Sequence, residues 1–273
     1  MQLLFFCPRW GHAQLSWDEL ARRARASGYD GIETDVPESP RDSDALQKAL
    51  ARHGLKMVAQ HWETMAPHFD QHARAYENRL RHLASANPWC INSHTGRDFF
   101  SMSENETLLE LARQVSEQYD VPVYHETHRG RFSFAAHATL PFLQIHPWLR
   151  LTWDVSHWIV VAETFLQDQP EAVDAAILHT GHLHARVGHT QGSQAPDPFG
   201  AAGQEALAAH LVYWDRVIDR VKADGRAAFG ITPEFGPAPY MPMHPDTGQP
   251  VRDQWELNAA MMRLLKKRYD TNE

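Results

Sequence analysis

Short apolar runs alternate with amphipathic helical segments along the whole chain of 273 residues. Eight of the runs are candidate strands, because each is brief and most are bounded by turn or helix signals. They cover residues 3–8, 31–34, 56–62, 90–95, 121–127, 149–155, 176–185 and 228–235. Eight successive βα units predict an α/β protein with a parallel sheet closed into a (β/α)8 TIM barrel.

The helical segments carry start and stop signals that fit this alternation. Ser16 and Glu19 form a capping box before one helix, and Gly28 follows it as a stop. The sixth helix is expected to be short and to lie near residues 159–175. Since no Ser/Gly-rich linker or change of composition divides the chain, residues 1–273 are expected to form a single domain. One long loop, 187–203, follows the seventh strand, and long ordered loops are often functional.

Composition narrows the class of partner. Hydrophobic residues make up 43% of the chain, which is enough for a substantial core. The formal net charge of -8 argues against sequence-independent binding to nucleic acid or to an anionic membrane. A small-molecule partner is therefore expected.

The number and spacing of the cysteines and the hydropathy of the chain indicate the cellular compartment. The two cysteines, Cys7 and Cys90, lack CxxC spacing, so neither a disulfide framework nor a thiolate zinc site is expected. The first residues include a short apolar run without the basic flank of a signal peptide, and no run approaches the length of a membrane span. A cytoplasmic protein fits these features best.

The last four predicted strands carry their polar side chains on one parity. In a TIM barrel, residues of one parity point inward and catalytic groups lie at the carboxyl ends of strands. The inward positions near those ends hold Glu126, Asp154, His184 and Glu234. The first three are 28 and 30 residues apart, about one βα unit each. Four consecutive strands therefore deliver three carboxylates and one imidazole to one place.

This set of donors predicts one divalent metal ion. Oxygen and nitrogen ligands without thiolates suit Mn²⁺ best, with Mg²⁺, Co²⁺ or Zn²⁺ as alternatives. Carboxylates buried so close together need a cation or protons to compensate their charge. The alternative is that each acid forms a separate salt bridge at its strand end, which is plausible for one residue and less so for all four.

Four further histidines are candidates for contact with substrate. His157 lies one turn past the sixth strand, and packing beside Trp158 is its structural alternative. His61 and His94 end the third and fourth strands and could line the other side of the pocket. His182 shares the inward parity of the metal ligands but lies deeper, so it is expected near the pocket floor.

Arginine and tryptophan also occur at the predicted pocket rim. Arg186 shares the inward parity of the seventh strand, and Arg97 and Arg129 follow the fourth and fifth strands. Such side chains hold phosphate, carboxylate or sugar hydroxyls, or else they form ordinary contacts between loops. Trp10 follows the first strand and could stack on a sugar or cover the mouth of the barrel.

At these residues the sequence resembles the xylose isomerase-like superfamily of TIM barrels, over nearly the whole chain. It resembles in particular the sugar (phosphate) isomerase/epimerase group, which includes tagatose 3-epimerase, hydroxypyruvate isomerase and inosose dehydratase. The matching segments are "GYDGIET", "YHETH", "WDVSH", "GHLHARVG" and "TPEFGP". The resemblance implies that Glu126, Asp154, His184 and Glu234 bind the cation and that His157 touches substrate. It also suggests a homo-oligomer.

Two departures from the group leave the substrate open. The epimerases place a substrate-binding Arg six residues after the metal-binding His, where this chain has Thr190. Inosose dehydratases read HxKD, where this chain has HARV at 184–187.

Endonuclease IV, a three-zinc nuclease, belongs to the same superfamily. His61, His94 and His157 match positions that it uses. Its Asp-x-His after the seventh strand is only half present here, as Asp197 with Phe199, and the net negative charge does not suit a DNA groove.

The chemistry that fits two carboxylates beside a metal is proton abstraction next to a carbonyl. We therefore expect an isomerase or epimerase of a small sugar or keto-sugar, acting through an enediolate with Glu126 and Glu234 as acid and base. A keto-sugar or keto-inositol lyase or dehydratase would use the same enolate and is the nearest alternative. A multi-zinc phosphoester hydrolase and a non-catalytic ligand-binding barrel are the alternatives of other classes.

Overall fold

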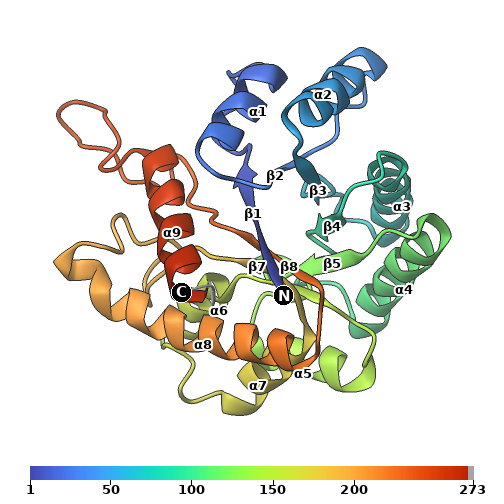
Figure 1. The fold of residues 1–273 in the computed structure, drawn as a ribbon. Helices are drawn as coiled ribbons and strands as arrows, with labels where there is room; N and C mark the ends of the chain where they lie inside the picture. The colour runs from blue at the N-terminus through green and yellow to red at the C-terminus, as the bar shows by residue number, and fades with distance from the viewer. Residues whose placement is uncertain (270–273) are drawn as a thin grey trace.

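The computed structural model describes residues 1–269, in which eight parallel strands close into a barrel surrounded by helices (Figure 1). Each strand pairs with the next in chain order, and β1 pairs with β8 to close the sheet. The predicted (β/α)8 TIM barrel is therefore confirmed. The strands are β1 (Gln2–Pro8), β2 (Gly31–Thr34), β3 (Lys56–His61), β4 (Cys90–Ser93), β5 (Val123–Glu126), β6 (Leu151–Trp153), β7 (Thr180–His184) and β8 (Ala228–Thr232).

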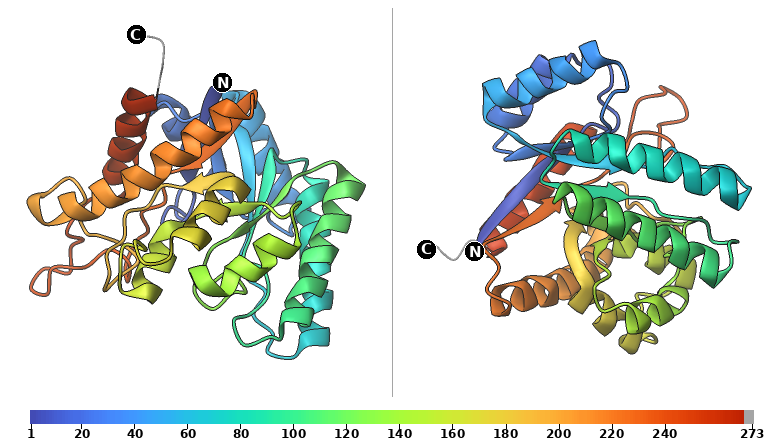
Figure 2. Two further views of the ribbon diagram at one scale, coloured as in Figure 1. Left: turned by 90° about the horizontal axis from the view of Figure 1, so that it is seen from below. Right: turned by 90° about the vertical axis from the view of Figure 1, so that its right-hand side faces the viewer.

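The helices cover the outer face of the barrel, as two further views show (Figure 2). Ser16, Ser39 and Ser101 begin three of them by accepting a backbone N–H in the first turn. The helices are α1 (Trp17–Ala26), α2 (Pro40–His53), α3 (Phe69–Ser85), α4 (Met102–Tyr119), α5 (Ala136–Ile145), α6 (Val155–Ala162), α7 (Pro170–His179), the 3-10 turn η1 (Ala201–Gly203), α8 (Gln204–Ala223) and α9 (Gln254–Tyr269). None of those in residues 1–269 is long and apolar enough to cross a membrane.

The floor of the barrel is filled by a small apolar cluster of inward-facing residues. Leu4, Phe6, Val58 and Cys90 pack together there, separate from the large core between sheet and helices. Gly31 lets β2 approach this cluster, since a Cβ at that position would lie 2.5 Å from the ring of Phe6. Because the lower half of the barrel is closed by apolar contacts, the polar inward residues gather at the carboxyl ends of the strands.

The predicted fourth to eighth strands were too long, and strands six and seven show the physical reason. Residues 176–179 form the last turn of α7, and only Thr180–His184 is strand. The apolar residues from 172 to 177 are buried at helical spacing, so the helix continues through them. Likewise Asp154 does not extend β6 but caps α6, where its side chain accepts the N–H of Ser156. The expected helix near 159–175 is therefore two helices, α6 and α7.

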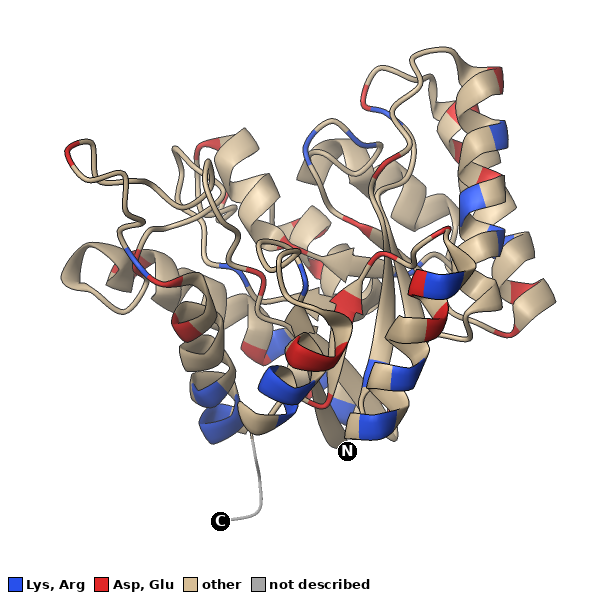
Figure 3. Cartoon of the chain, turned by 90° about the horizontal axis from the view of Figure 1, so that it is seen from above, with Lys and Arg blue, Asp and Glu red and all other residues tan. Residues whose placement is uncertain are grey.

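Several Lys and Arg residues lie at the ends of helices near the N-terminal edge of the barrel (Figure 3). The last turns of α1, α2 and α9 all carry Lys or Arg, where the charges complement the helix dipoles. These turns lie at the opposite end of the barrel from the carboxyl ends of the strands.

Candidate metal centre and pocket

The four predicted metal-binding side chains converge at the carboxyl ends of the last four strands. Glu126 ends β5, Asp154 follows β6, His184 ends β7 and Glu234 follows β8, and all four are buried. Nδ1 of His184 lies 3.2 Å from Oε2 of Glu234 and 3.6 Å from Oε1 of Glu126. One donor atom from each of the four lies within 4.8 Å of the others. The sequence-based grouping therefore corresponds to one compact cluster.

The orientation of His184 suits a metal ligand. Its Nε2 lies 3.0 Å from Oε1 of Glu33, which is placed to accept the N–H. Nδ1 faces the cluster, and this buried atom has no hydrogen-bond partner. Burial would lower the pKa of His184, but Glu234, Glu33 and Glu126 outweigh it and raise this pKa well above its usual value, so a bound cation would take the place of a proton at Nδ1. A carboxylate that fixes the outer nitrogen of a metal-binding histidine is a common arrangement in metal sites. The three carboxylates and the orphaned imidazole nitrogen therefore fit a divalent cation.

Glu33 is a buried neighbour of the cluster that the sequence analysis missed. It is the third residue of β2 and points into the barrel, and 1% of its surface is exposed. Besides His184, its carboxylate accepts from the hydroxyl of Thr232 and from Nδ2 of Asn92 at 2.8 Å. Burial alone would raise the pKa of Glu33, but the imidazoles of His184 and His182 outweigh it and hold the pKa below its usual range.

Glu126 and Asp154 are held in different ways. Burial would raise the pKa of Glu126, but His94 and His184 outweigh it and keep this pKa well below its usual value. Asn92 also donates to Glu126, over 2.7 Å. Burial raises the pKa of Asp154 despite the nearby guanidinium of Arg186. A buried carboxylate whose negative charge is not fully compensated is stabilised by a bound cation.

Arg186 lies within the cluster instead of reaching out from the rim. Its side chain is 1% exposed, and one guanidinium nitrogen donates to Asp154. The same nitrogen lies 2.7 Å from Nε2 of His157, and a second lies 3.6 Å from Glu234. Burial alone would lower the pKa of Arg186, but Asp154 and Glu234 outweigh it and raise this pKa. Arg186 is therefore a permanent positive charge beside the expected metal ligands.

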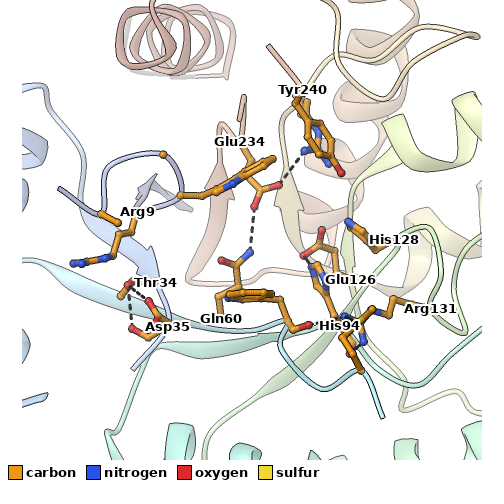
Figure 4. Close-up of a pocket in the computed structure, with 16 residues that line it drawn as sticks. Arg9, Thr34, Asp35, Gln60, His94, Glu126, His128, Arg131, Glu234 and Tyr240 are labelled. Carbon is orange, nitrogen blue, oxygen red and sulfur yellow. Dashed lines mark hydrogen bonds and ion pairs between the residues drawn. The ribbon is translucent and has the colours of Figure 1, made fainter. Parts of the chain in front are cut away.

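A cavity of about 620 Å³ opens onto this cluster (Figure 4). Of the predicted residues, Glu126, Glu234, Arg186, His94 and Trp10 line it. The edge of the Trp10 ring meets Tyr240, with 5.0 Å between the ring centroids. The complete lining is Arg9, Trp10, Gly11, Ala13, Thr34, Asp35, Gln60, Trp62, Met65, His94, Glu126, His128, Arg131, Arg186, Glu234 and Tyr240.

A second group of donors shares Glu126. His94 Nε2 lies 2.8 Å from Oε2 of Glu126, and His128 completes a set of three donors within 4.8 Å. The ring centroids of His94 and His128 are 4.3 Å apart, and the ring of His128 lies 4.0 Å from that of His157 at an interplanar angle of 47°. His157 thus lies behind His128 and Arg186 and does not line the cavity.

Three predicted substrate contacts lie elsewhere. His61 points out of the barrel and packs against Tyr76 of α3, with 5.1 Å between the ring centroids. Thr64 Oγ1 at 2.7 Å and Ser93 Oγ at 3.2 Å occupy both of its nitrogens. Alternate residues of β3 point into the barrel, and Gln60 is one of them, so the neighbouring His61 points outward and cannot line the cavity. Arg97 joins two loops through the carbonyls of Gly130 and Met65.

His182, the third, lies below the cavity. Its Nε2 is 2.9 Å from the hydroxyl of Thr232 and 3.6 Å from Glu33, so it supports the Glu33 carboxylate from beneath. His182 thus lies near the pocket floor, as expected, but it is not among the residues that line the cavity.

Gln60 and Tyr240 are pocket residues that the sequence analysis did not select. Nε2 of Gln60 donates to Oε1 of Glu234 over 3.2 Å, which fixes that carboxylate from the side of β3 (Figure 4). The alternation of inward residues along β3 could have identified Gln60. Tyr240 lies in the long segment after β8, where no periodic signal exists.

Solved structures with the same fold include enzymes of several kinds. The probable 3-DHS dehydratase involved in petrobactin synthesis from Bacillus anthracis is 19% identical, with a TM-score of 0.60, and the match covers 98% of this chain and 100% of that one. D-allulose 3-epimerase from Methylomonas sp. is 14% identical, with a TM-score of 0.65 and 98% of both chains covered. Endonuclease IV from Thermus thermophilus is 14% identical, with a TM-score of 0.58, and the match covers 98% of this chain and 100% of that one.

At these identities the likenesses show the fold alone. No curated protein matches the sequence. A family description does match it: residues 21–263 fit the xylose isomerase-like TIM barrel family, which is most of the chain. The match agrees with the closed barrel and with the buried carboxylate and histidine cluster at its carboxyl end. The chain therefore belongs to the xylose isomerase-like TIM barrel family.

Proposed function

We propose that this protein is a divalent-metal-dependent isomerase or epimerase of a small sugar or keto-sugar. The observation that carries the proposal is the convergence of Glu126, Asp154, His184 and Glu234 beside a closed-ended cavity. Two of these carboxylates, Glu126 and Glu234, also line the cavity, so they can reach a ligand bound there.

Glu126 and Glu234 are the proposed acid and base. Each keeps one oxygen toward His184 and has its other oxygen fixed by a neighbour, His94 for Glu126 and Gln60 for Glu234. Carboxylates held in this way can remove a proton from a carbon next to a carbonyl and return it. A divalent cation in the cluster would polarise the oxygens of a hydroxy-ketone and stabilise the negative charge of an enediolate.

The cavity suits a carbohydrate. A volume of about 620 Å³ accommodates a small sugar, and Trp10 and Tyr240 offer apolar ring surfaces beside the charged end. Arg186 adds a hydrogen-bond donor on the cavity wall. Mixed aromatic and polar walls of this kind fit a ring that bears hydroxyl groups.

A lyase or dehydratase of a keto-sugar or keto-inositol is the nearest alternative. It would form the same enolate and then expel a hydroxyl group. Relatives of this fold include both an epimerase and a dehydratase, so the fold supports either outcome. The two reactions differ in product: a lyase releases water, whereas an isomerase or epimerase conserves the formula.

The test is deuterium uptake in heavy water. The Mn²⁺-loaded protein is incubated with a panel of ketoses, keto-sugars, keto-inositols and hydroxypyruvate, and exchange is followed by NMR. We expect uptake at the carbon beside the carbonyl, reduced by about 100-fold or more in Glu126→Gln and in Glu234→Gln. The exposed Glu117→Gln on α4 is the matched control and should keep full exchange. Turnover without exchange, or exchange unaffected by both substitutions, would contradict the proposal.

The cluster of His94, Glu126 and His128 favours a second candidate, a phosphoester hydrolase with two or more ions. Against it, His61 is occupied by Ser93 and Thr64. Asp197, the retained half of the Asp-x-His pattern of endonuclease IV, forms an ion pair with Arg252 at 3.4 Å. Cleavage of an abasic-site DNA duplex by the Zn²⁺-loaded protein would support this candidate. Absence of cleavage together with proton exchange on a ketose would exclude it.

A further inference from the structure

We propose that Arg186 is an internal counter-ion that competes with the divalent cation for the carboxylates of Asp154 and Glu234. The proposal rests on the metal site of the proposed function but not on the reaction carried out there. It concerns the affinity of the site for metal and the stability of the protein when no metal is bound.

The contacts of Asp154 carry the argument. One of its oxygens accepts both the backbone N–H of Ser156, at 2.9 Å, and the hydroxyl of Ser156 at 2.5 Å. The other oxygen accepts from the guanidinium of Arg186. Both oxygens of a fully buried carboxylate are therefore already satisfied within the chain. A cation that binds Asp154 has to share it with Arg186 or replace that ion pair.

The charge balance points the same way. Glu126, Asp154 and Glu234 bring three carboxylates to one buried point, where the imidazole of His184 and the guanidinium of Arg186 face them. Of these two groups, only Arg186 carries a positive charge that does not depend on pH. A buried charge without compensation is strongly destabilising, so the guanidinium stabilises the metal-free cluster. It also repels an incoming cation, and metal binding is weakened by both effects.

Two aromatic rings near the guanidinium of Arg186 offer it an alternative position when it is not paired with Asp154. Its central carbon is 5.0 Å from the ring of Tyr240 and 6.0 Å from the ring of Trp10, both of which line the cavity. Aromatic faces stabilise a cation at such distances. A guanidinium released from Asp154 would thus remain on the cavity wall, beside Glu234.

The test compares Mn²⁺ affinity by isothermal titration calorimetry. Arg186→Met removes the charge with little change in length, and Arg186→Lys keeps the charge without the planar fork. The matched control is Arg129→Met, since Arg129 donates to the neutral hydroxyls of Ser193 and Tyr240. We expect Arg186→Met to bind Mn²⁺ about tenfold more tightly or better, Arg186→Lys to fall between it and the wild type, and Arg129→Met to stay within about twofold.

Thermal unfolding supplies the second measurement. Without metal, Arg186→Met should melt below the wild type, and Mn²⁺ should raise its melting temperature by more than it raises that of the wild type. A variant that folds only when Mn²⁺ is present supports the proposal equally. Mn²⁺ affinity that is unchanged or weaker in Arg186→Met overturns it. Deuterium exchange by the wild type would still test the proposed function separately.

Discussion

The carboxylate of Glu33 determines which nitrogen of His184 faces the cluster. It lies 3.0 Å from Nε2 of His184, and this contact leaves Nδ1 facing Glu126 and Glu234 without a hydrogen-bond partner. Glu33 is in turn held by Asn92 and Thr232 from the neighbouring barrel wall. The orientation of the imidazole is therefore set by residues that do not themselves face the cavity.

Replacing Glu33 by Gln should weaken metal binding. The amide removes the negative charge behind His184 and no longer selects one protonation of the ring. Loss of such a supporting carboxylate typically costs 10-fold to 100-fold in metal affinity, so a rise of about that size in the Kd for Mn²⁺ is expected. Calorimetric titration measures it, with circular dichroism to verify the fold and Glu117→Gln as the control. An unchanged Kd would mean that Glu33 has no part in the site.

The alternation of inward and outward residues along the strands predicts the cluster on the last four strands and also marks inward polar residues on the earlier ones. On β5 to β8 it selects Glu126, Asp154, His184 and Glu234, which the structure brings together. Extended to β2, β3 and β4, the same alternation selects Glu33, Gln60 and Asn92 and rejects His61. The residues His128 and Tyr240 lie beyond strand ends, where the path of the loop decides their direction and no alternation applies.

The boundary between α7 and β7 shows why element lengths were less predictable than element order. The run "AILH" at 176–179 is apolar enough for either a buried strand or a buried helix, and length alone does not separate them. In the structure the hydroxyl of Thr180 donates to the carbonyl of Ala176, so the turn is completed before the strand begins. The packing of α7 against its neighbours therefore determines that residues 176–179 are helical.

The contact between α8 and the segment after β7 depends on an uncharged histidine. His210 donates from Nδ1 to the carbonyl of Ala206 and accepts the N–H of Gly188 at Nε2, over 3.1 Å. Burial lowers the pKa of His210 to about 4. In the unfolded chain the same group titrates near its ordinary value of about 6.5. The unfolded state thus takes up a proton first as the pH falls.

Stability should therefore decrease as the pH falls from about 6.5 toward about 4, because only the unfolded state gains the proton in that interval. His210 accounts for about 2 kcal/mol of this loss between pH 7 and pH 4.5. Urea unfolding at a series of pH values should show a smaller pH dependence for His210→Gln than for the wild type. The exposed His137→Gln should retain the wild-type slope, and equal slopes for all three proteins would contradict the assignment.

At the scale of the whole molecule, the residues that pack the barrel and the residues that form the candidate site lie in different halves of it. Apolar residues fill its lower half, and the polar inward residues open into one cavity at the carboxyl ends of the strands. This division follows from the repeated βα pattern, which is why the barrel and the position of the site were predictable from the sequence. The substrate was not, because the cavity walls come largely from loops whose paths depend on tertiary contacts.

The central claim is that Glu126, Asp154, His184 and Glu234 together hold a single divalent ion. Equilibrium dialysis followed by elemental analysis measures the bound metal directly and also detects weak binding. The account predicts one Mn²⁺ per chain at saturation, and loss of that ion in Asp154→Asn and in His184→Gln. Absence of any bound Mn²⁺, Mg²⁺, Co²⁺ or Zn²⁺, two or more ions per chain, or full binding by both variants would contradict it.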